Sequence, residues 1–424
     1  MTDTLAVLLG GRVIGHVVRH ETRSRERLSF EYADDYPVDA TPLSFSMPTP
    51  VGSHPDAVVT PWLWGLLPDN DTVLDRWSRA FQVSASSPFS LLSAPIGEDC
   101  AGAVSFVPSD RVDRSLDRPR EVDWLTEAEV AQRLRDLRQD ATAWLGRTFT
   151  GQFSLAGAQA KTALLLDGDR WGVPSGPTPT THILKPAVVG LDDHDLNEHL
   201  CLDAGRRAGL IVARSSIARF ADQTALVVER YDRQVAANGV ERVHQEDLCQ
   251  ALGIPPWKKY QNEGGPGPAQ IADLLRSAMS TPAADADVNR FADALIWNWV
   301  IGGTDAHAKN YSVLLSGPDV RLAPLYDVAS ALPYGIHERK LRLAMKIGGD
   351  YHVYPQRNTW PAAARDLGLD PDGLVERCRD LVSTAPDAFV DAAAAADVAS
   401  LGSSLPAKLV DLVADRAARC LQIL

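Results

Sequence analysis

The sequence predicts an α+β fold whose C-terminal part is mostly helical, and three observations support this prediction. Short apolar runs typical of strands fill the beginning of the chain. From residue 151 onward, strand-like segments alternate with segments of helical periodicity. The end of the chain, about 60 residues, is rich in Ala and Leu, which favour helices. With 424 residues, 45% of them hydrophobic, the chain is long enough for two to three domains.

The N-terminal part is predicted to be a small β-containing module, which we assign to residues 1–110. Two β-rich runs flank a Gly-Gly pair in LAVLLGGRVIGHVV, and RLSFEY and PLSFSM continue the strand signals. The stretch from Pro108 to Glu121 is crowded with Arg, Asp, Ser and Pro, a composition typical of linkers. A helical pattern resumes near Thr126, so residues 111–150 are assigned to a linker and a helix.

The rest of the chain mixes both kinds of element. Strands are predicted for TALLL, THILK, TALVVERY and YSVLL, and helices for LNEHLCLDAGRRAGL and RFADALIWNWV. The tryptophans of WNWV fit a buried helix better than a cofactor-binding surface.

Composition limits the possible functions. Forty-two Lys and Arg against 55 Asp and Glu give a formal charge of -13, which disfavours nonspecific binding to nucleic acid and attracts basic partners. The five cysteines are far apart and form no C-x-x-C pair, so buried thiols in a reducing cytosol are expected rather than disulfides or a zinc site. No run approaches eighteen apolar residues, so neither secretion nor membrane spanning is expected, and we predict a cytoplasmic protein.

The loop GTDAHAKN, which follows the apolar helical segment ending in WNWV, places four functional side chains together. Asp305 and Asn310 have the spacing of the kinase catalytic loop, in which Asp receives the substrate hydroxyl proton and Asn holds magnesium. Taken alone, this pair is also typical of ordinary turn capping. Downstream, YSVLL and VRLAPLYD predict a hairpin whose returning strand ends in Asp327, a second carboxylate that phosphoryl transfer requires as a metal ligand.

Upstream segments supply the other parts of a kinase. Around Gly157 the backbone amides of Ala-Gly-Ala can approach an anion closely. Lys161 lies at the start of a predicted strand, and Lys185 lies at the end of another, as the lysine of the third kinase strand does. Glu198 can pair with a lysine, and Glu229 begins a hinge that offers backbone groups to adenine. Taken one at a time, Gly157 is also typical of an ordinary turn, Lys185 of a surface lysine at a strand end, and Glu198 of a solvated acid on a helix. Their order (phosphate loop, lysine, helix, hinge, catalytic loop, metal acid) predicts a nucleotide-dependent kinase.

The chain resembles the HipA family of serine/threonine kinase toxins from bacterial type II toxin-antitoxin pairs. The resemblance covers nearly the full length and rests on blocks in the family's order. These blocks are LSFSMP, WGLLPDN, IGEDCAGAVSFVP, SLAGAQAKTALL, THILKP, NEHLCLDAG, LVVERYDR, VHQEDLCQALGIPPWKKYQNEGGPG, WNWVIGGTDAHAKN and LAPLYDVASALPY. The resemblance implies a bilobal, protein-kinase-like core. Residues 151–235 would be its N-lobe with phosphate loop and hinge, and residues 236–424 a helical C-lobe with the catalytic loop.

Carried over by position, the resemblance makes Asp305 the catalytic acid, Asn310 and Asp327 the magnesium ligands, and Lys185 the phosphate-binding lysine. Ser154 matches a serine on which such kinases phosphorylate themselves. The further ATP contacts that the resemblance implies are Ala156, Gly157, Ala158, Gln159, Ala160 and Lys161 in the phosphate loop, Glu229, Arg230 and Tyr231 in the hinge, and His307, Ala308, Lys309, Asn310, Tyr326 and Asp327 near the catalytic loop.

The implied function is that of the toxin of a toxin-antitoxin pair. Such a protein is an ATP- and Mg2+-dependent kinase that phosphorylates a protein substrate in translation, such as an aminoacyl-tRNA synthetase, and inhibits growth. The implied partner is a helix-turn-helix antitoxin similar to HipB, with DNA reached only through the antitoxin complex. This chain departs from the family's pattern at Ala160, where Glu is frequent, and at Gly303, where Asn is often found.

Two other functions remain open at this point. The D-x-H-x-x-N pattern also resembles the catalytic loops of phosphoinositide kinases and of small-molecule kinases of the aminoglycoside type, which differ in the acceptor. A nonenzymatic corepressor that senses nucleotide and docks on a DNA-binding antitoxin would need no catalytic groups, and the intact set of Asp305, Asn310 and Asp327 argues against that role alone.

Overall fold

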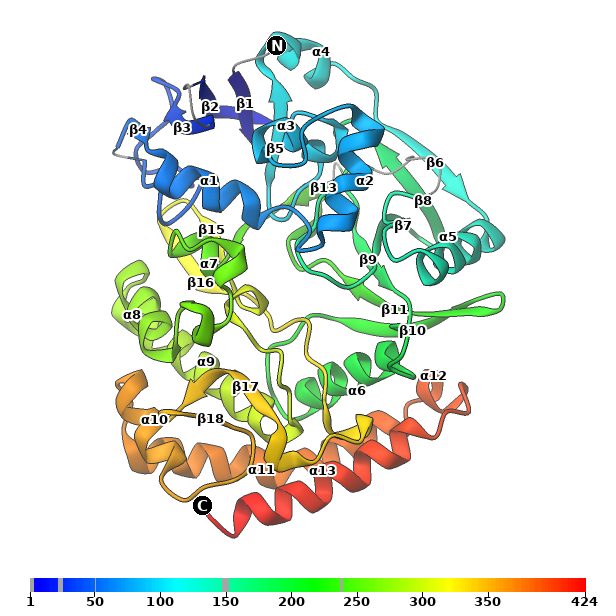
Figure 1. The fold of residues 1–424 in the computed structure, drawn as a ribbon, viewed down its shortest axis with the longest axis vertical. Helices are drawn as coiled ribbons and strands as arrows, with labels where there is room; N and C mark the ends of the chain where they lie inside the picture. The colour runs from blue at the N-terminus through cyan, green and yellow to red at the C-terminus, as the bar shows by residue number, and fades with distance from the viewer. Residues whose placement is uncertain (1–3, 22–25, 50, 147–151, 237–238) are drawn as a thin grey trace.

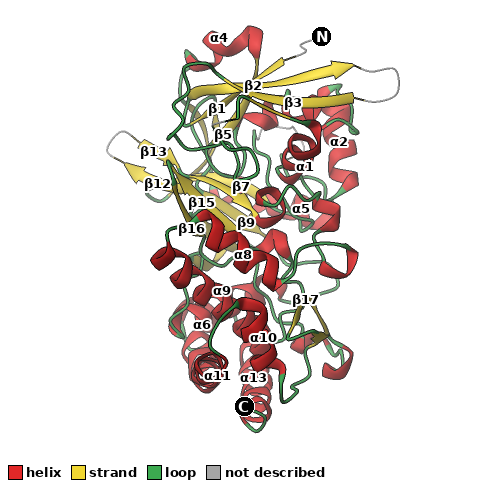
Figure 2. Cartoon of the chain, turned by 90° about the vertical axis from the view of Figure 1, so that its left-hand side faces the viewer, coloured by secondary structure: helices red, strands yellow, loops and turns green. Residues whose placement is uncertain are grey.

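The structure is a computed structural model, and it describes the chain except for residues 1–3, 22–25, 50, 147–151 and 237–238. It confirms the predicted α+β fold: the strands of the two larger sheets all lie before residue 230, and the longest helices lie after residue 280 (Figure 1). In side view the molecule is elongated. One sheet lies at the end that holds the N-terminus, further strands lie in the middle, and helices fill the opposite end (Figure 2). The predicted boundary between residues 150 and 151 lies outside the described residues.

The N-terminal module contains an antiparallel sheet of five strands in the order β4-β3-β2-β1-β5. Their bounds are β1 Thr4–Leu9, β2 Arg12–Glu21, β3 Glu26–Tyr32, β4 Ser53–His54 and β5 Val104–Pro108. The predicted Gly-Gly turn joins β1 to β2, because Gly10 and Gly11 adopt φ angles of 57° and 86° that favour glycine. The strand predicted for PLSFSM is wrong. Ser44 and Met47 form only an isolated bridge, and the Ser44 hydroxyl instead bonds Ser46 within a local turn.

Helices pack against this sheet and bury large aromatic residues. Their bounds are α1 Asp56–Gly65, α2 Asp71–Phe81 and α3 Pro88–Leu92, followed by the short 3-10 helix η1 Pro95–Glu98. Phe30, Trp62 and Trp77 are fully buried in one core, which also includes Phe153 and Leu155 from the segment before the second sheet. The N-terminal module therefore packs directly onto the chain segment that was predicted to bind phosphates.

The predicted linker has more structure than its composition indicates. It holds η2 Ser109–Arg111, α4 Val112–Leu116, β6 Glu121–Leu125 and α5 Glu127–Gln139. β6 pairs with β8 and becomes the edge strand of the second sheet, which the Arg- and Pro-rich composition did not reveal. The helix predicted to begin near Thr126 is confirmed, and Thr126 caps it in a capping box with Glu129.

The second sheet has six strands in the order β10-β11-β9-β7-β8-β6, and every neighbouring pair is antiparallel. The bounds of the other strands are β7 Thr162–Asp167, β8 Arg170–Ser175, β9 His182–Lys185, β10 Ser215–Phe220 and β11 Gln223–Glu229, followed by the hairpin β12 Arg233–Ala236 and β13 Gly239–Arg242. Helix α6 (His194–Arg207) packs between this sheet and the C-terminal helices. The strands predicted for TALLL, THILK and TALVVERY are confirmed, and so is the helix after THILK.

The remaining elements build the helical part around α9, as Figure 1 shows. Its helices are α7 Leu248–Ala251, α8 Pro268–Ala278, α9 Thr281–Ile301, α10 Thr359–Leu367, α11 Pro371–Ala393, α12 Ala396–Ala399 and α13 Leu405–Leu421, with short 3-10 helices η3 Pro256–Lys258, η4 Gln261–Glu263, η5 Ala308–Asn310, η6 Leu332–Tyr334 and η7 Glu338–Lys340. Its strands are β14 His244–Asp247, β15 Ser312–Ser316 and β16 Asp319–Leu322 in one sheet, and β17 Arg342–Ile347 and β18 Asp350–His352 in another. Trp297 and Trp299 are each 1% exposed, so the prediction that WNWV belongs to the core is confirmed.

The hairpin predicted to end in Asp327 is partly wrong. β15 and β16 pair as expected, but β16 ends at Leu322, and Asp327 lies beyond it in an irregular segment with φ 58°. Pro324 lacks the N–H that a continuing strand would need. The segment turns toward residues 211–213, where the amide of Leu325 donates to the Ile211 carbonyl at 3.0 Å.

Two predictions about the whole chain can be compared with the structure. All five cysteines are buried and unpaired, which confirms the prediction of free thiols. Among the helices of the described residues, none combines the length and the apolar character that crossing a bilayer requires.

Candidate active site

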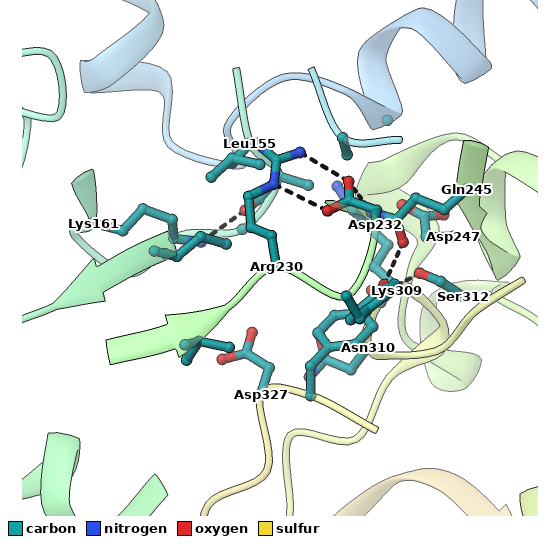
Figure 3. A pocket seen from close by; sticks show the side chains of 18 of the residues that line it. Leu155, Lys161, Arg230, Asp232, Gln245, Asp247, Lys309, Asn310, Ser312 and Asp327 are labelled. Carbon is teal, nitrogen blue, oxygen red and sulfur yellow. Dashed lines mark hydrogen bonds and ion pairs between the residues drawn. The ribbon is translucent and has the colours of Figure 1, made fainter. Parts of the chain in front are cut away.

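A cavity with about 930 Å³ of space, partly open to solvent, lies between the second sheet and the loops of the helical part (Figure 3). Ile183 and Val228 give it apolar walls on the sheet side, while lysines and carboxylates gather at its other end. The predicted ATP contacts that line it are Ala156, Gly157, Lys161, Lys185, Glu229, Arg230, Tyr231, His307, Lys309, Asn310, Tyr326 and Asp327. Four other predicted contacts do not line it, namely Ala158, Gln159, Ala160 and Ala308.

Lys185 lies at the centre of the charged end. Its Nζ donates to Glu198 Oε1 at 2.7 Å and to Asp327 Oδ1 at 2.6 Å. Glu198 on α6 is 1% exposed, so of the two alternatives that the sequence left open, the structure shows a pair with a lysine and not a solvated helix acid. Burial would lower the pKa of Lys185, but the two carboxylates outweigh this effect and raise the pKa, so the ammonium group stays charged.

Asp327 enters the cavity from the irregular segment after β16. Burial would raise its pKa, but the ammonium groups of Lys185 and Lys161 hold the pKa of Asp327 below its usual range. The carboxylate is therefore ionised at neutral pH, which is the form that binds a metal ion.

The predicted phosphate loop is held from both sides. Gly157 has φ 102°, and its carbonyl accepts a hydrogen bond from the Asp69 amide at 3.1 Å. Lys161 Nζ donates to the Ala156 carbonyl at 2.7 Å and lies 5.0 Å from the centre of the Trp144 ring. Burial and the nearby charge of Lys185 lower the pKa of Lys161 to about 8. The loop thus brings glycine backbone and a lysine that titrates near neutrality to the cavity wall.

Asp305 lies beside the cavity rather than in its wall, and it is exposed. Its Oδ1 accepts a hydrogen bond from the Tyr260 hydroxyl at 2.6 Å. Asn310 Nδ2 donates to the Asp305 carbonyl at 2.8 Å, and since only the nitrogen can donate, this bond fixes which way the Asn310 amide faces. The Asn310 side chain is therefore bound to the backbone of Asp305. The Asp305 side chain lies on the solvent side of this short turn, and the Asn310 side chain lies on the cavity side.

His307 and Lys309 lie between these two residues and are both 5% exposed. His307 stacks edge-on with Tyr260 at 5.0 Å, its Nδ1 finds no hydrogen-bond partner among the described residues, and burial lowers its pKa. Lys309 Nζ binds Asp69 Oδ1 at 2.5 Å, and Asp69 Oδ2 binds Lys259 Nζ at 2.8 Å. Asp69 belongs to the N-terminal module, so this module contributes a carboxylate to the catalytic loop.

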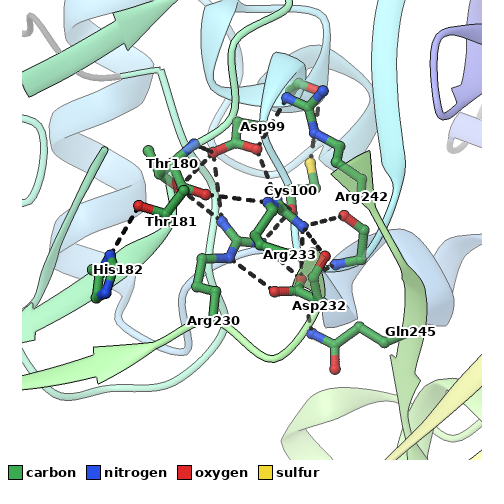
Figure 4. A network of polar contacts seen from close by, with 12 residues as sticks. Asp99, Cys100, Thr180, Thr181, His182, Arg230, Asp232, Arg233, Arg242 and Gln245 are labelled. Atoms are coloured by element: carbon green, nitrogen blue, oxygen red, sulfur yellow. Dashed lines mark hydrogen bonds and ion pairs between the residues drawn. The ribbon is translucent and has the colours of Figure 1, made fainter. Parts of the chain in front are cut away.

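The predicted hinge residues have different surroundings. Tyr231 lines the cavity beside Tyr326, with ring centres 5.7 Å apart. Arg230 is 3% exposed, and its guanidinium donates to Asp232, to the Thr180 hydroxyl and to the Cys100 carbonyl (Figure 4). Its amide donates to the Thr181 carbonyl at 2.9 Å. Because the protein uses both groups, the geometry favours a structural role for Arg230 over a nucleotide contact.

The departure from the family's pattern at Gly303 has a steric explanation. A Cβ at position 303 would lie 2.4 Å from Asn298 Oδ1, and the Asn298 amide is itself held by the Ala294 carbonyl and the Tyr311 hydroxyl. In this chain the space for a side chain at 303 is filled by Asn298. At the other departure, Ala160 packs on the edge of the N-terminal core, where a small apolar side chain fits.

Sequence reasoning missed several residues of the cavity. Asp69 comes from a block that was matched only to the N-terminal module, and Gln245, Glu246 and Asp247 come from β14, where no local pattern marks them as polar lining. Only the WGLLPDN and VHQED blocks of the family resemblance pointed to these segments. Ser312 also lines the cavity, and its hydroxyl lies 2.6 Å from that of Tyr326.

The residues present fit a nucleotide with magnesium. Mg2+ is commonly held by one or two side-chain oxygens together with substrate phosphates and water, and Asn310 and Asp327 both line the cavity (Figure 3). Lys185 and Lys161 lie where they would neutralise phosphates, and the apolar walls would take a flat base. No group of three or more His, Cys, Asp or Glu within the described ranges forms a metal-binding cluster, so the chain by itself offers no dedicated metal cage.

A strand-rich lobe, a helical lobe and a charged cavity between them, with a lysine joined to a helix glutamate, define a protein with a kinase-like fold. The family comparison is more specific. The HipA-like C-terminal domain matches residues 153–389, and the HipA N-terminal domain matches residues 5–107. The chain belongs to the HipA family.

Individual relatives agree with this membership over nearly the whole length. The protein Y4mE of Sinorhizobium fredii is 33% identical over 390 residues, which cover 91% of this chain and 90% of that protein. The serine/threonine-protein kinase toxin HipA of Shewanella oneidensis is 30% identical over 409 residues, which cover 92% and 89%. The solved complex of HipA, HipB and operator DNA from Shewanella oneidensis superposes with a TM-score of 0.83 at 26% identity, covering 99% of this chain and 98% of that chain.

Proposed function

We propose that this protein is a serine/threonine protein kinase that uses ATP and Mg2+ and acts as the toxin of a toxin-antitoxin pair. The observation that carries the proposal is the placement of Lys185 between Glu198 and Asp327 at the charged end of the cavity, in a chain of the HipA family. A lysine fixed by a helix glutamate next to a metal-binding aspartate is the arrangement that phosphoryl transfer needs, because catalysis there depends on positioning and charge neutralisation.

Each residue has a defined task in this proposal. Asp305 accepts the proton of the acceptor hydroxyl through the carboxylate oxygen that Tyr260 does not occupy. Asn310 and Asp327 hold magnesium, and Lys185 and Lys161 bind phosphate oxygens. MgATP supplies the phosphoryl group. Lys185 now contacts Asp327 directly, so nucleotide binding exchanges this contact for contacts to phosphate and metal.

The acceptor is proposed to be a protein of translation, such as an aminoacyl-tRNA synthetase, whose modification inhibits growth. The proposed partner is a small, basic helix-turn-helix antitoxin, because the Shewanella oneidensis HipA was solved with HipB and operator DNA, and because a charge of -13 attracts a basic protein. DNA would be reached only through that antitoxin. A purified chain that forms no complex with the product of the neighbouring reading frame in gel filtration would contradict the partner assignment.

Ser154 is the proposed site of autophosphorylation. It lies just before the phosphate loop and is fully buried, with its hydroxyl donating to the Leu66 carbonyl at 2.8 Å and its amide donating to the Asp99 carbonyl at 2.9 Å. In this conformation the buried hydroxyl cannot reach the active site of a kinase, so its phosphorylation requires the segment around Ser154 to move out of its place.

The decisive experiment replaces the proton acceptor and a metal ligand separately. Asp305→Asn and Asp327→Asn should each lose autophosphorylation and growth inhibition, since loss of a general base alone costs about 10²- to 10⁴-fold. Asn tolerates the φ of 58° at position 327, so the melting temperature should stay close to that of the original protein. Asp319→Asn, at an exposed site on β16, is the matched control and should keep full activity.

Full activity of either active-site variant would refute the site assignment. Parallel assays with lipid, sugar and protein acceptors separate the proposed protein kinase from kinases that share the catalytic loop but use other acceptors. Transfer to a sugar or a lipid alone would replace the proposed acceptor class and leave the cavity assignment intact.

A further inference from the structure

A second hollow, with about 1370 Å³ of largely open space, adjoins the nucleotide cavity on its outer side. We call it the outer groove. One wall runs from the end of α1, which supplies Trp64, to α2, which supplies Leu74. The other wall is the η3 segment, which supplies Pro256 and Trp257. The groove therefore runs between the N-terminal module and the helical part, and it shares Asp69 with the nucleotide cavity.

The outer groove and the nucleotide cavity meet at the catalytic loop. Asp69 lines both, and Lys259, which is bound to Asp69 at 2.8 Å, lines the groove. The next residue, Tyr260, donates to Asp305 Oδ1 at 2.6 Å. Trp257 is thus three positions from Tyr260, and Tyr260 is hydrogen-bonded to Asp305, the proposed proton acceptor. A peptide that lies in the groove can therefore present a side chain to Asp305.

Trp257 gives the groove an apolar anchor point. Its side chain is 60% exposed, whereas Trp62, Trp77, Trp144, Trp297 and Trp299 are at most 1% exposed. A large aromatic side chain left open at a groove is typical of a binding site, since such residues contribute most to recognition when a partner covers them.

The charge of the groove selects the kind of partner. Asp71 and Asp75 lie exposed on the groove side of α2, and within the described ranges no ion pair involves either of them. Asp69 is neutralised by Lys259 and Lys309. Arg76 and Arg79 of the same helix line a neighbouring hollow, to which Asp75 and Thr142 also contribute, and they do not line the groove. The N-terminus of α2 does not attract an anion, because Asn70 accepts the amide hydrogens of Thr72 and Val73.

We propose that the outer groove binds the segment of the substrate protein that carries the acceptor serine or threonine, and that it selects segments with basic residues and one large apolar residue close to the acceptor. The basic side chains lie along Asp71 and Asp75, and the apolar side chain packs on Trp257. An extended segment advances about 3.3 Å per residue, so these contacts fall within a few residues of the acceptor. This proposal rests on the proposed kinase function and adds its substrate preference.

Binding is tested first without catalysis. Two fluorescein-labelled peptides of 13 residues share one central serine and one leucine, and they differ only in carrying two lysines or two glutamates at the same positions. One such pair carries the charged residues before the serine, and a second pair carries them after it. Fluorescence anisotropy with the full-length protein should show that the lysine peptide binds at least tenfold more tightly than the glutamate peptide. Trp257→Ala should weaken the lysine peptide at least fivefold, and the double variant Asp71→Lys/Asp75→Lys should reverse the preference.

Matched controls are available on exposed sites elsewhere. Trp124 is 40% exposed on β6, and Asp110 and Asp113 are exposed in η2 and α4, so Trp124→Ala and Asp110→Lys/Asp113→Lys should bind both peptides as the original protein does. With ATP present, the groove variants should raise the KM for the lysine peptide and leave the KM for ATP and the rate of autophosphorylation unchanged.

Three results would overturn the proposal: equal affinity for both peptides, groove variants that bind like the original protein, or groove variants that lose the antitoxin in a pull-down while keeping the lysine peptide. The last result would assign the groove to the antitoxin. A different result would contradict the proposed kinase function and not the groove. In that result the lysine peptide binds and Trp257→Ala weakens this binding, but neither the peptide nor the protein itself is phosphorylated.

Discussion

At the scale of single residues, the site is a balance of buried charges. Lys185 donates to two carboxylates, whereas Lys161 donates to a backbone carbonyl and lies over the Trp144 ring, and both lysines line the same cavity. The two lysines therefore differ in how firmly they hold their protons. Lys185 stays charged because Glu198 and Asp327 are its partners, whereas burial and the repulsion from Lys185 lower the pKa of Lys161 to about 8.

This difference predicts a pH dependence of nucleotide binding. Lys161 is charged below pH 8 and neutral above it, so its attraction for phosphate is present at lower pH and is lost as the pH rises. Calorimetry with a nonhydrolysable ATP analogue should show an affinity that is constant from pH 6.5 to 7.5 and about tenfold weaker at pH 9.5.

The matched variant is Lys161→Arg, which stays charged over this range. It should remove most of the decline in affinity above pH 8. A decline of the same size in the arginine variant would show that another group is responsible for the pH dependence.

A second prediction at this scale concerns Ser154. Ser154→Ala removes one buried hydrogen bond, to Leu66, and should cost about 1 kcal/mol of stability while keeping ATP binding and transfer to other proteins. Phosphorylation adds about -1.5 to -2 charges to a fully buried position beside the phosphate loop, so the loop must move outward and the modified protein should bind ATP far more weakly.

Calorimetry on the two purified forms, separated by their phosphate content, measures this difference. Equal ATP affinity for the phosphorylated and the unmodified protein would rule out a switch at Ser154.

At the scale of elements, the catalytic loop depends on the last helix of the chain. α9 ends at Ile301, and the loop begins at Gly302, which has φ 66°. Arg416 on α13 is fully buried, and its guanidinium donates to the carbonyls of Trp299 and Val300 at the end of α9. These carbonyls belong to the last turn of a helix, where intrahelical amide donors run out. The Trp299 carbonyl also accepts the Gly302 amide at 3.3 Å.

Replacing Arg416 should therefore affect both stability and rate. Arg416→Met leaves the two α9 carbonyls without this donor and leaves Glu338 without a buried partner, which should cost about 3 to 5 kcal/mol in chemical denaturation. The rate of phosphoryl transfer should fall as well, since the loop that holds Asp305 loses its support. Arg419 is the outer partner of Glu338, and its side chain is 44% exposed. Arg419→Met should therefore lower the free energy of unfolding by less than about 1 kcal/mol. Similar losses in the two variants would contradict this role for Arg416.

The elements themselves were largely predictable, because hydrophobic periodicity and glycine positions are local signals. The helix ending in WNWV and the strand ending in Lys185 were predicted for that reason. β6 was not, because its edge position in the sheet comes from pairing with β8, about 50 residues later. Likewise, β16 ends at Leu322 because Pro324 follows and because Leu325 forms backbone hydrogen bonds with residues 211–213. The proline is visible in the nearby sequence, but the hydrogen bonds to residues more than 100 positions earlier are not.

At the scale of the whole molecule, a buried ionic network joins the N-terminal module to the hinge of the nucleotide cavity. Asp99 binds Arg233 at 2.9 Å, Arg242 at 3.2 Å and Arg230 at 3.5 Å, and Arg230 also binds Asp232 at 2.8 Å (Figure 4). Burial would raise the pKa of Asp99, but the three guanidinium groups hold this pKa well below its usual range, so the carboxylate is ionised. No spacing rule in the sequence relates Asp99 to Arg233, and the same is true of Asp69 and Lys309. This part of the site was therefore beyond sequence reasoning.

The network predicts that a change in the N-terminal module weakens nucleotide binding at the hinge. Asp99→Asn leaves buried arginines without their carboxylate and should lower the free energy of unfolding by about 3 to 5 kcal/mol in chemical denaturation. The affinity for an ATP analogue, measured at low temperature where the variant is folded, should also fall. Glu98→Gln is the control, because its partner Arg118 is 38% exposed and the pair contributes less than about 1 kcal/mol. Unchanged ATP affinity in the Asp99 variant would contradict the link between network and hinge.

The contact between Asp69 and Lys309 also constrains when the protein becomes active during its synthesis. The two residues are 240 positions apart, and a ribosome that adds 5 to 20 residues per second needs about 10 to 50 s to make the intervening chain. The core of the N-terminal module, which is completed by residues up to Ala163, can form in that interval, but Asp69 has no Lys309 to bind until residue 309 has been added. Arg416 supports the end of α9 from α13, 116 positions after Val300. Under the proposed function, the nascent chain would therefore gain kinase activity only after α13 has been made as well.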